Sequence, residues 1–311
     1  FARSEGFPTV QEALDRAVSV LGAQPSKKMD ASVEEDDGQQ RRSGFCVGAG
    51  RTDAGVHALG QVIHFDLLRK QRKTNAPMEA ISGDDVRKAA NYYLRQNENA
   101  DIQVVSATKV SSGFHARFSA RMRHYVYRVG LTHAPSVFEL QRSWHVPEQL
   151  DFEQMQLAAS VLEGEHDFSS FRGARCQARS PIRRIEAIKL DGCSLTEDFS
   201  PCVVSSSTPS GLLSPQSPSS PAELLRATST ISRATAILHV RVASRGFLYN
   251  QVRRMVGALV DVGRGEMSVS QLREILEKRD NSLLRTVAPP HGLYFAEVEY
   301  DDTEDCSLEE L

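Results

Sequence analysis

Hydrophobic residues in this chain follow helical spacing in some segments and strand spacing in others. Apolar side chains recur every three or four residues from Val10 to Leu21, which predicts an amphipathic helix, and Thr9 and Glu12 form a capping box at its start. The same spacing predicts further helices at 82–94, 151–162, 247–262 and 271–277.

Alternating apolar and polar positions predict strands between these helices. The clearest alternation runs from Tyr125 to Leu131, where every second residue is apolar, and this pattern is typical of a half-buried strand. Strands are also predicted at 44–48, 61–66, 101–108, 185–190, 235–243 and 293–300. The order of elements predicts an α+β protein of two halves, 1–135 and 136–300, with an acidic tail at 301–311.

One segment does not fit either pattern. Nine serines and five prolines occupy the 22 positions from Ser200 to Pro221. Such a composition buries too little apolar surface to offset the entropy of ordering the chain, so we interpret 200–226 as a disordered insertion between two strands.

The charge distribution favours a nucleic-acid partner although the formal net charge is −3. Three arginine-containing stretches carry no acidic residue: Ser111–Ala134, Phe168–Ile185 and Arg241–Val260. The acids gather instead at Asp30–Asp37 and from Glu297 onward, where they can face solvent away from a basic groove.

Cysteine and histidine usage indicates neither disulfides nor a metal. The five cysteines are scattered without a C-x-x-C pair, which favours a reducing compartment: the cytoplasm first, with nucleus or mitochondrion left open. No apolar run is long enough for a membrane span, and no targeting segment is visible. No metal ligation is expected, because none of the following histidines forms an H-x-x-x-H pair or joins a cysteine at ligand spacing: His57, His64, His115, His124 and His166.

The segment Gly48–His57, GAGRTDAGVH, is the strongest candidate for chemistry. Its small residues let another molecule approach closely, and its glycines can bring Arg51 and Asp53 to a surface between two strands. Spacing alone leaves two interpretations open, a functional loop and an ordinary glycine-rich turn.

The amino-acid sequence of this segment resembles a known catalytic motif. GAGRTDAGVHALGQVIHF resembles, almost residue for residue, the motif of the TruA-type tRNA pseudouridine synthases. Four later segments resemble further motifs of that family in the same order: SGFHARFSARMRHYVY at 112–127, HDFSSF at 166–171, RGFLYNQVRRMVG at 245–257 and GLYF at 292–295. The Ser/Pro-rich insertion lies outside the family pattern, and the family's first strand, with an aspartate and a Gly-Trp element, would precede residue 1.

The resemblance implies a role for each of four residues. Asp53 matches the catalytic aspartate, and Arg253 matches the cation that keeps this carboxylate charged. Arg51 matches an arginine that enters the base stack as the target base leaves, and Tyr125 matches a tyrosine that stacks on the flipped uracil. The alternation alone favours a buried strand tyrosine at position 125, and only the neighbouring RHY pattern reverses this. Without the resemblance, Arg253 would be interpreted as a helix-surface arginine.

The resemblance also implies fold, substrate and assembly. The expected fold is that of the pseudouridine synthases: two pseudo-symmetric α+β halves, a mixed and largely antiparallel sheet, and a central RNA-binding cleft. The expected reaction isomerises uridine to pseudouridine in the anticodon stem-loop of tRNA, around nucleotides 38–40. The resemblance implies no cofactor and no metal. It also implies a homodimer, with no membrane as a partner.

Two other classes of protein compete with this reading. An RNA-binding module without catalysis would explain the arginines and would use Tyr125 and Tyr127 as stacking aromatics, but it leaves an acid in a glycine-rich turn unexplained. A phosphotransferase with an aspartate nucleophile would need a second carboxylate for magnesium near Asp53, and Thr52, Ala54 and Val56 offer none.

Deleting Ser200 to Pro221 should leave folding and turnover intact, because this composition contributes neither core nor arginine. Thermal melting and pseudouridine formation of the deletion variant, compared with the full chain, measure this. A loss of either would mean that the segment has a structural role.

Overall fold

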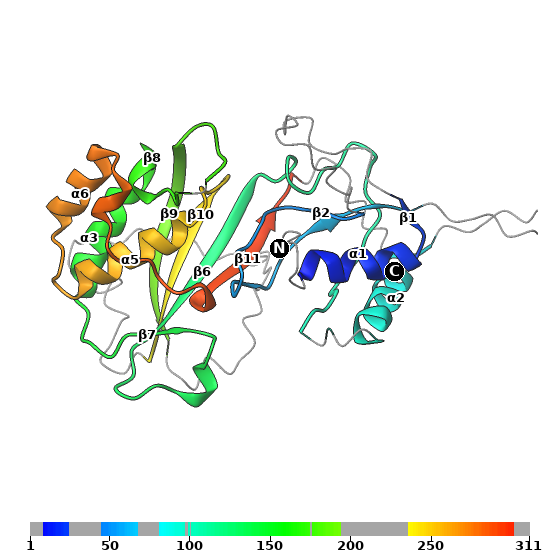
Figure 1. Ribbon diagram of the computed structural model, residues 1–311, viewed down its shortest axis with the longest axis horizontal. Coiled ribbons are helices and arrows are strands. Elements are labelled where there is room, and N and C mark those ends of the chain that lie inside the picture. Colours follow the sequence, from blue (N-terminus) through cyan, green and yellow to red (C-terminus); the bar gives the residue numbers. More distant parts are fainter. Residues whose placement is uncertain are drawn as a thin grey trace, which may run out of the picture. The chain divides into compact units, whose positions relative to one another are not determined.

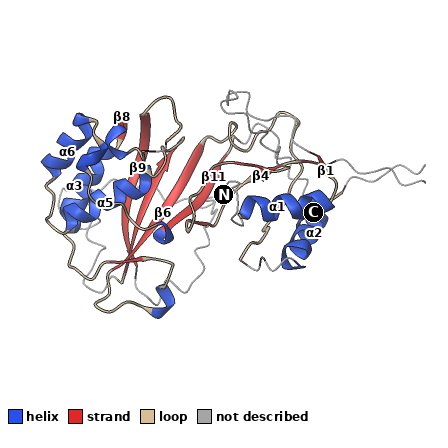
Figure 2. Cartoon of the chain, viewed as in Figure 1, coloured by secondary structure: helices blue, strands red, loops and turns tan. Residues whose placement is uncertain are grey.

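A computed structural model describes most of the chain between residues 9 and 301 (Figures 1 and 2). The described residues are 9–24, 45–67, 81–96, 99, 101–174, 176–193 and 236–301. The predicted insertion at 200–226 and the tail after Asp301 lie outside them. Internal contacts group the chain into two units: 1–54 with 60–121 and 298–311, and 55–59 with 122–297.

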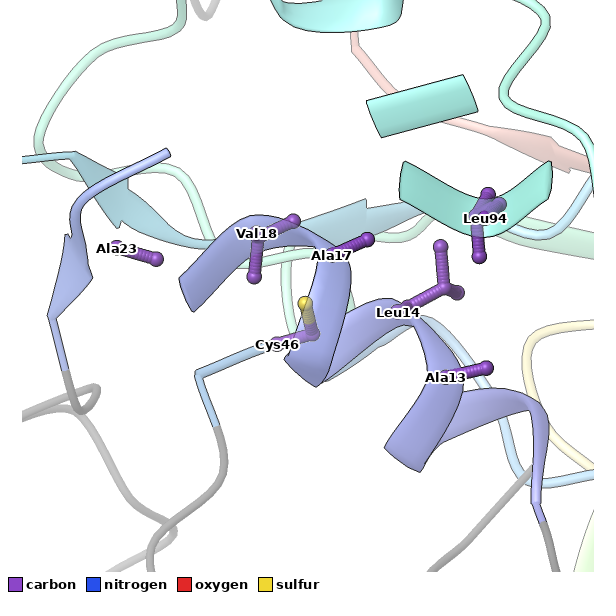
Figure 3. Close-up of a cluster of buried hydrophobic side chains, with 7 residues drawn as sticks. All are labelled: Ala13, Leu14, Ala17, Val18, Ala23, Cys46 and Leu94. Atoms are coloured by element: carbon purple, nitrogen blue, oxygen red, sulfur yellow. The ribbon is translucent and has the colours of Figure 1, made fainter. Parts of the chain in front are cut away.

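The first unit is built on two helices. Helix α1 (Val10–Val20) begins where predicted, and the Thr9 side chain accepts a hydrogen bond from the Glu12 N–H at 3.2 Å. Helix α2 (Gly83–Gln96) begins after Ser82, whose Oγ accepts from the Asp85 N–H at 3.1 Å. Their apolar faces form a buried cluster with residues of the adjoining strand segments (Figure 3). Its members are Ala13, Leu14, Ala17, Val18, Ala23, Cys46 and Leu94.

Two short antiparallel pairs of strands complete this unit. β1 (Ala23–Gln24) pairs with β5 (Asp66–Leu67), and β2 (Val47–Gly48) pairs with β4 (Ile63–His64). The buried Asp15 of α1 accepts a hydrogen bond from the Cys46 N–H at 2.7 Å, just before β2. This bond connects the helix to the strand pair that carries residues Gly50–Gly55, which we call the GRTDAG loop.

The strand predicted at 101–108 is wrong. Ile102 and Val104 do alternate toward the core of this unit, but the segment pairs with no strand among the described residues. The side chain of Asn91 on α2 instead takes both backbone groups of Val104, donating to its carbonyl and accepting from its N–H at 2.8 Å each. A helix side chain has replaced the ladder bonds that would have made a strand.

The second unit contains a mixed, largely antiparallel sheet (Figure 2). Its order is β3 (His57–Ala58), β11 (Leu293–Glu299), β6 (Met122–Gly130), β10 (Ile237–Ser244), β9 (Ile182–Cys193) and β8 (Gly164–Asp167), with β7 (Trp144–His145) beside β6. The pairs β6–β10, β10–β9 and β9–β8 are antiparallel, whereas β3–β11 and β6–β7 are parallel. These strands confirm the alternation read from Tyr125 to Leu131.

Three helices of this unit pack together near β9 (Figure 1): α3 (Phe152–Leu162), α5 (Gln251–Gly263) and α6 (Val269–Lys278). The helix predicted at 151–162 is present as α3, and the Asp151 side chain caps it by accepting from the Gln154 N–H at 3.0 Å. Every residue of α5 is buried except Arg253 and Arg254, so this helix forms the centre of the unit. Short 3-10 helices connect these elements: η1 (Val137–Glu139), η2 (Ser169–Phe171), η3 (Asn281–Leu283) and η4 (Pro290–Gly292).

The segment from Thr286 to Ala288 lies directly against α5. A Cβ at Gly257 would fall on the Thr286 carbonyl group, 2.9 Å from its carbon, so only glycine permits this approach. The Ala288 N–H then donates to the Arg253 carbonyl at 3.1 Å. The spacing of two chain segments therefore depends on one absent methyl group.

Gly257→Ala should lower the free energy of unfolding by about 1–3 kcal/mol, because overlap with a fixed backbone group outweighs the helix propensity gained from alanine. Urea denaturation measures the change. The control is Gly246→Ala, whose Cβ would meet nothing within 4 Å, and whose stability should change by less than about 0.5 kcal/mol. Equal stability of the two variants would contradict the close approach.

Candidate active site

The GRTDAG loop leaves the β2–β4 pair and is closed at its base. Gln61 Nε2 donates to the Gly50 carbonyl at 2.8 Å, and the Ala49 N–H donates to the Val62 carbonyl at the same distance. Because small residues surround them, Arg51 is exposed and Asp53 is partly exposed. The loop thus presents an acid and a base at the surface of the first unit.

The residues that follow Asp53 belong to the second unit. Gly55 has a φ of +80°, a left-handed conformation that favours glycine. The chain then forms β3 beside β11, where the His57 ring stacks on Tyr294 with centroids 4.6 Å apart. The Leu59 N–H donates to the Phe295 carbonyl at 2.9 Å and ends the pairing.

One stretch, Thr286–Phe295, contacts most of the predicted site in the second unit, and we call it the 286–295 segment. A Cβ at Gly55 would lie 3.2 Å from the Pro290 side chain, and one at Gly292 would lie 2.6 Å from the Tyr127 ring. The Tyr127 hydroxyl donates to the Pro289 carbonyl at 2.7 Å. Burial raises the pKa of Tyr127 against the opposing positive charge of Arg253, so its hydroxyl stays protonated as a donor.

Arg253 is fixed by the same segment. Its Nε donates to the Ala288 carbonyl at 2.7 Å, and its Nη1 donates to Asn250 Oδ1 at 3.0 Å. Asn250 precedes α5 with a φ of 62°, a left-handed conformation that Asn tolerates better than most residues. The half-buried guanidinium is therefore held by a backbone carbonyl and a side-chain amide rather than extended into solvent.

Cys176 contacts the loop before α5. Its Sγ accepts a hydrogen bond from the Tyr249 N–H at 3.4 Å. Burial alone would raise the pKa of this thiol, but hydrogen bonds from the Ala178 and Tyr249 backbones and from Arg172 lower it overall. The cysteine therefore contributes an acceptor for the backbone next to Asn250.

Tyr125 is buried, with 9% of its surface exposed. Its ring packs edge-on against Phe247, with centroids 5.1 Å apart, and tilted against Phe295 at 4.9 Å. Two aromatic rings therefore hold the Tyr125 ring in the packed part of the second unit.

Some arginines of the three acid-free stretches have partners within the folded protein. Arg128 pairs with Glu139 at 3.0 Å, and both side chains are largely buried. Arg172 donates instead to the carbonyls of Cys176 and Ala178, at 2.8 and 2.6 Å. Part of the predicted basic surface is therefore structural.

Of the predicted site residues, Tyr125 and Arg253 lie in the second unit, and both contact the 286–295 segment. Arg51 and Asp53 lie in the first unit. Sequence reasoning missed Asn250 and the stretch from Thr286 to Pro290. The pair Pro289-Pro290, separated from the GLYF motif only by His291, was the available signal for the latter.

Within the described ranges, no group of three or more His, Cys, Asp or Glu side chains is arranged to hold a metal ion. Among the same residues, no helix combines the length and the apolar character needed to cross a bilayer.

Comparison with known proteins identifies the class. A family model described as tRNA pseudouridine synthase matches residues 158–301, and the mixed α+β fold agrees with it. The chain belongs to the tRNA pseudouridine synthase family, whose members isomerise uridine to pseudouridine in tRNA.

Its similarity to curated relatives extends over nearly the whole chain. The tRNA pseudouridine synthase A of Maricaulis maris is 35% identical over 298 residues, which cover 96% of this chain and 91% of that protein. The protein of the same name from Sinorhizobium fredii is 34% identical, covering 96% and 92%. That from Anaplasma phagocytophilum is 33% identical, covering 92% and 93%.

Proposed function

We propose that this protein isomerises uridine to pseudouridine in the anticodon stem-loop of tRNA. The observation that carries the proposal is the similarity to tRNA pseudouridine synthases A over more than nine-tenths of the chain. The reaction breaks the N1–C1′ bond, turns the uracil and joins C5 to C1′, while the C5 proton leaves and N1 gains one. This balance requires no redox partner and no nucleotide cofactor.

Asp53 is the proposed catalyst. A carboxylate can attack the sugar or the base covalently, or take a proton from the ribose, and each route needs it ionised. Its partly exposed position in a loop of small residues is compatible with close approach of a flipped nucleotide.

The other three residues receive supporting roles. Arg253 is the proposed cation that keeps Asp53 charged, and its two anchoring hydrogen bonds support a fixed position for that charge. Tyr125 is proposed to contact the uracil by stacking, and the exposed Arg51 to fill the space that the base leaves.

We also propose that the protein works as a homodimer, as the family resemblance implies. Light scattering coupled to size-exclusion chromatography should give the mass of two chains. A single-chain mass at assay concentrations would overturn this part of the proposal.

Asn250 provides a test of the role of Arg253. Asn250→Gly keeps the left-handed backbone but removes the acceptor, so kcat should fall roughly tenfold for the loss of one charge-assisted hydrogen bond. Asn250→Asp keeps the acceptor and should retain most activity. If both variants turn over like the parent, while melting at the parental temperature, this hydrogen bond does not position a catalytic group.

Asp53→Asn is the decisive variant, because it preserves shape and removes charge and nucleophilicity. Pseudouridine formation on unmodified tRNA transcripts, mapped at single-nucleotide resolution, should fall by at least about 10²-fold, while tRNA affinity changes little. The matched control is Asp101→Asn, which removes an exposed carboxylate from a turn of the same unit and should leave turnover unchanged.

The same assay separates the alternatives. Near-parental single-turnover rates in the Asp53→Asn variant would exclude Asp53 as the catalyst. Tight tRNA binding by the parent chain without any modification would favour the RNA-binding module. Modification outside the anticodon stem-loop would retain the reaction and correct its site.

A further inference from the structure

The turn from His115 to Ser119 in the first unit is held unusually firmly for a surface loop. The Ser119 N–H donates to the His115 carbonyl at 2.9 Å, and the His115 N–H donates back to Ser119 Oγ at 3.1 Å. The Ala116 N–H donates to His64 Nδ1 at 3.1 Å. The Ala116 carbonyl accepts from the Tyr300 hydroxyl at 2.7 Å, and Ala116 itself is fully buried.

The two remaining amides of the turn are bound by a single ring nitrogen. His115 Nδ1 accepts from the N–H groups of Arg117 and Phe118, at 3.2 and 3.3 Å. All five consecutive amides from His115 to Ser119 therefore have partners. A turn with this many internal bonds has its backbone fixed before any partner arrives, so it loses little entropy on binding.

This rigid turn displays an aromatic side chain to solvent. Phe118 is 60% exposed, although phenylalanine is usually buried. One face of its ring is supported by His115, with centroids 4.4 Å apart and a tilt of 34°. The guanidinium carbon of the exposed Arg117 lies 5.6 Å from the centre of the same ring.

The charge around this ring indicates which partner it suits. The stretch from Ser111 to Ala134 contains no acidic residue, and Arg117 stands at its exposed turn. An unpaired nucleobase offers a flat π-face to an aromatic ring and carries a phosphate that an arginine can contact.

We propose that Phe118 and Arg117 form a stacking platform for an unpaired base of tRNA, with Phe118 contacting the base and Arg117 its phosphate. This inference rests on the proposed function, since it takes tRNA as the ligand. It adds a contact for RNA in the first unit, apart from the residues assigned to catalysis.

Binding of an unmodified tRNA transcript to the full chain tests the platform. Phe118→Ala should raise Kd about tenfold, because stacking on an aromatic side chain is lost, whereas Phe118→Trp should bind as tightly as the parent. Arg117→Ala should weaken binding and reduce the slope of log affinity against log salt by about one contact, a slope that Phe118→Ala leaves unchanged.

The matched control is Tyr92→Ala. Tyr92 is an aromatic residue of the same unit with nearly the same exposure, 59%, but it lies on α2, whose charges are of both signs. Its removal should leave tRNA affinity unchanged. A fully double-stranded RNA, which offers no unpaired base, should bind the parent and Phe118→Ala equally.

The platform would be overturned if Phe118→Ala bound tRNA with parental affinity, or if Tyr92→Ala lost as much tRNA affinity as Phe118→Ala. It would also be overturned if Phe118→Trp bound tRNA as weakly as Phe118→Ala, or if Phe118→Ala lost as much affinity for duplex RNA as for tRNA. Unchanged melting temperatures exclude unfolding as the cause, as expected for an exposed side chain. If the parent binds tRNA through Phe118 but forms no pseudouridine, the proposed function fails and the platform stands. If the parent modifies tRNA and Phe118→Ala binds and turns over normally, only the platform fails.

Discussion

The arrangement of the second unit depends on how closely the 286–295 segment approaches its neighbours. At Gly55, Gly257 and Gly292, a single added methyl group would press against this segment or against the Tyr127 ring beside it. Because these positions lack side chains, backbone carbonyls of the segment come within reach of a buried phenol and a guanidinium. A buried polar group that lacks its hydrogen bond costs free energy. The close packing of the 286–295 segment and the orientation of Arg253 therefore depend on each other.

The arginines considered above fall into two groups. Arg253 and Arg172 donate to backbone carbonyls and hold loops in place, and Arg128 is paired with Glu139. Arg51 and Arg117 are exposed on turns of the first unit, where an anionic partner can reach them. A count of basic residues in sequence therefore overstates the charge offered to RNA, whereas the position of each arginine on a turn or in a packed element distinguishes its task.

The spacing of hydrophobic residues predicted helices and strands correctly where buried positions recur with one regular period along the segment. The alternation after Tyr125 and the helices capped by Thr9 and Asp151 depend on neighbours in sequence, and they are present. The segment 101–108 has the alternation of a strand, yet Asn91, a residue of another element, takes its backbone bonds. No local pattern contains that information.

The candidate site was predictable to the same extent. The glycine-rich setting of Asp53 indicated a surface loop, while the proposal that it is the catalyst rests on the resemblance to a family. The contacts of Arg253 with Ala288 and of Tyr127 with Pro289 join residues far apart in sequence. Local spacing therefore assigned no contact to Asn250, although it lies within the motif at 245–257, or to the stretch that contains Pro289-Pro290.

The pairing of β3 with β11 has a consequence for the synthesis of the protein. His57 and Ala58 find their strand partners, Tyr294 and Phe295, only near the other end of this sequence. A growing chain on the ribosome therefore carries the GRTDAG loop without the strand that anchors its C-terminal side until Tyr294 and Phe295 have been synthesised. Such long-range closure is slow, and nascent chains halted before β11 would expose the edge of β6 to unwanted pairing.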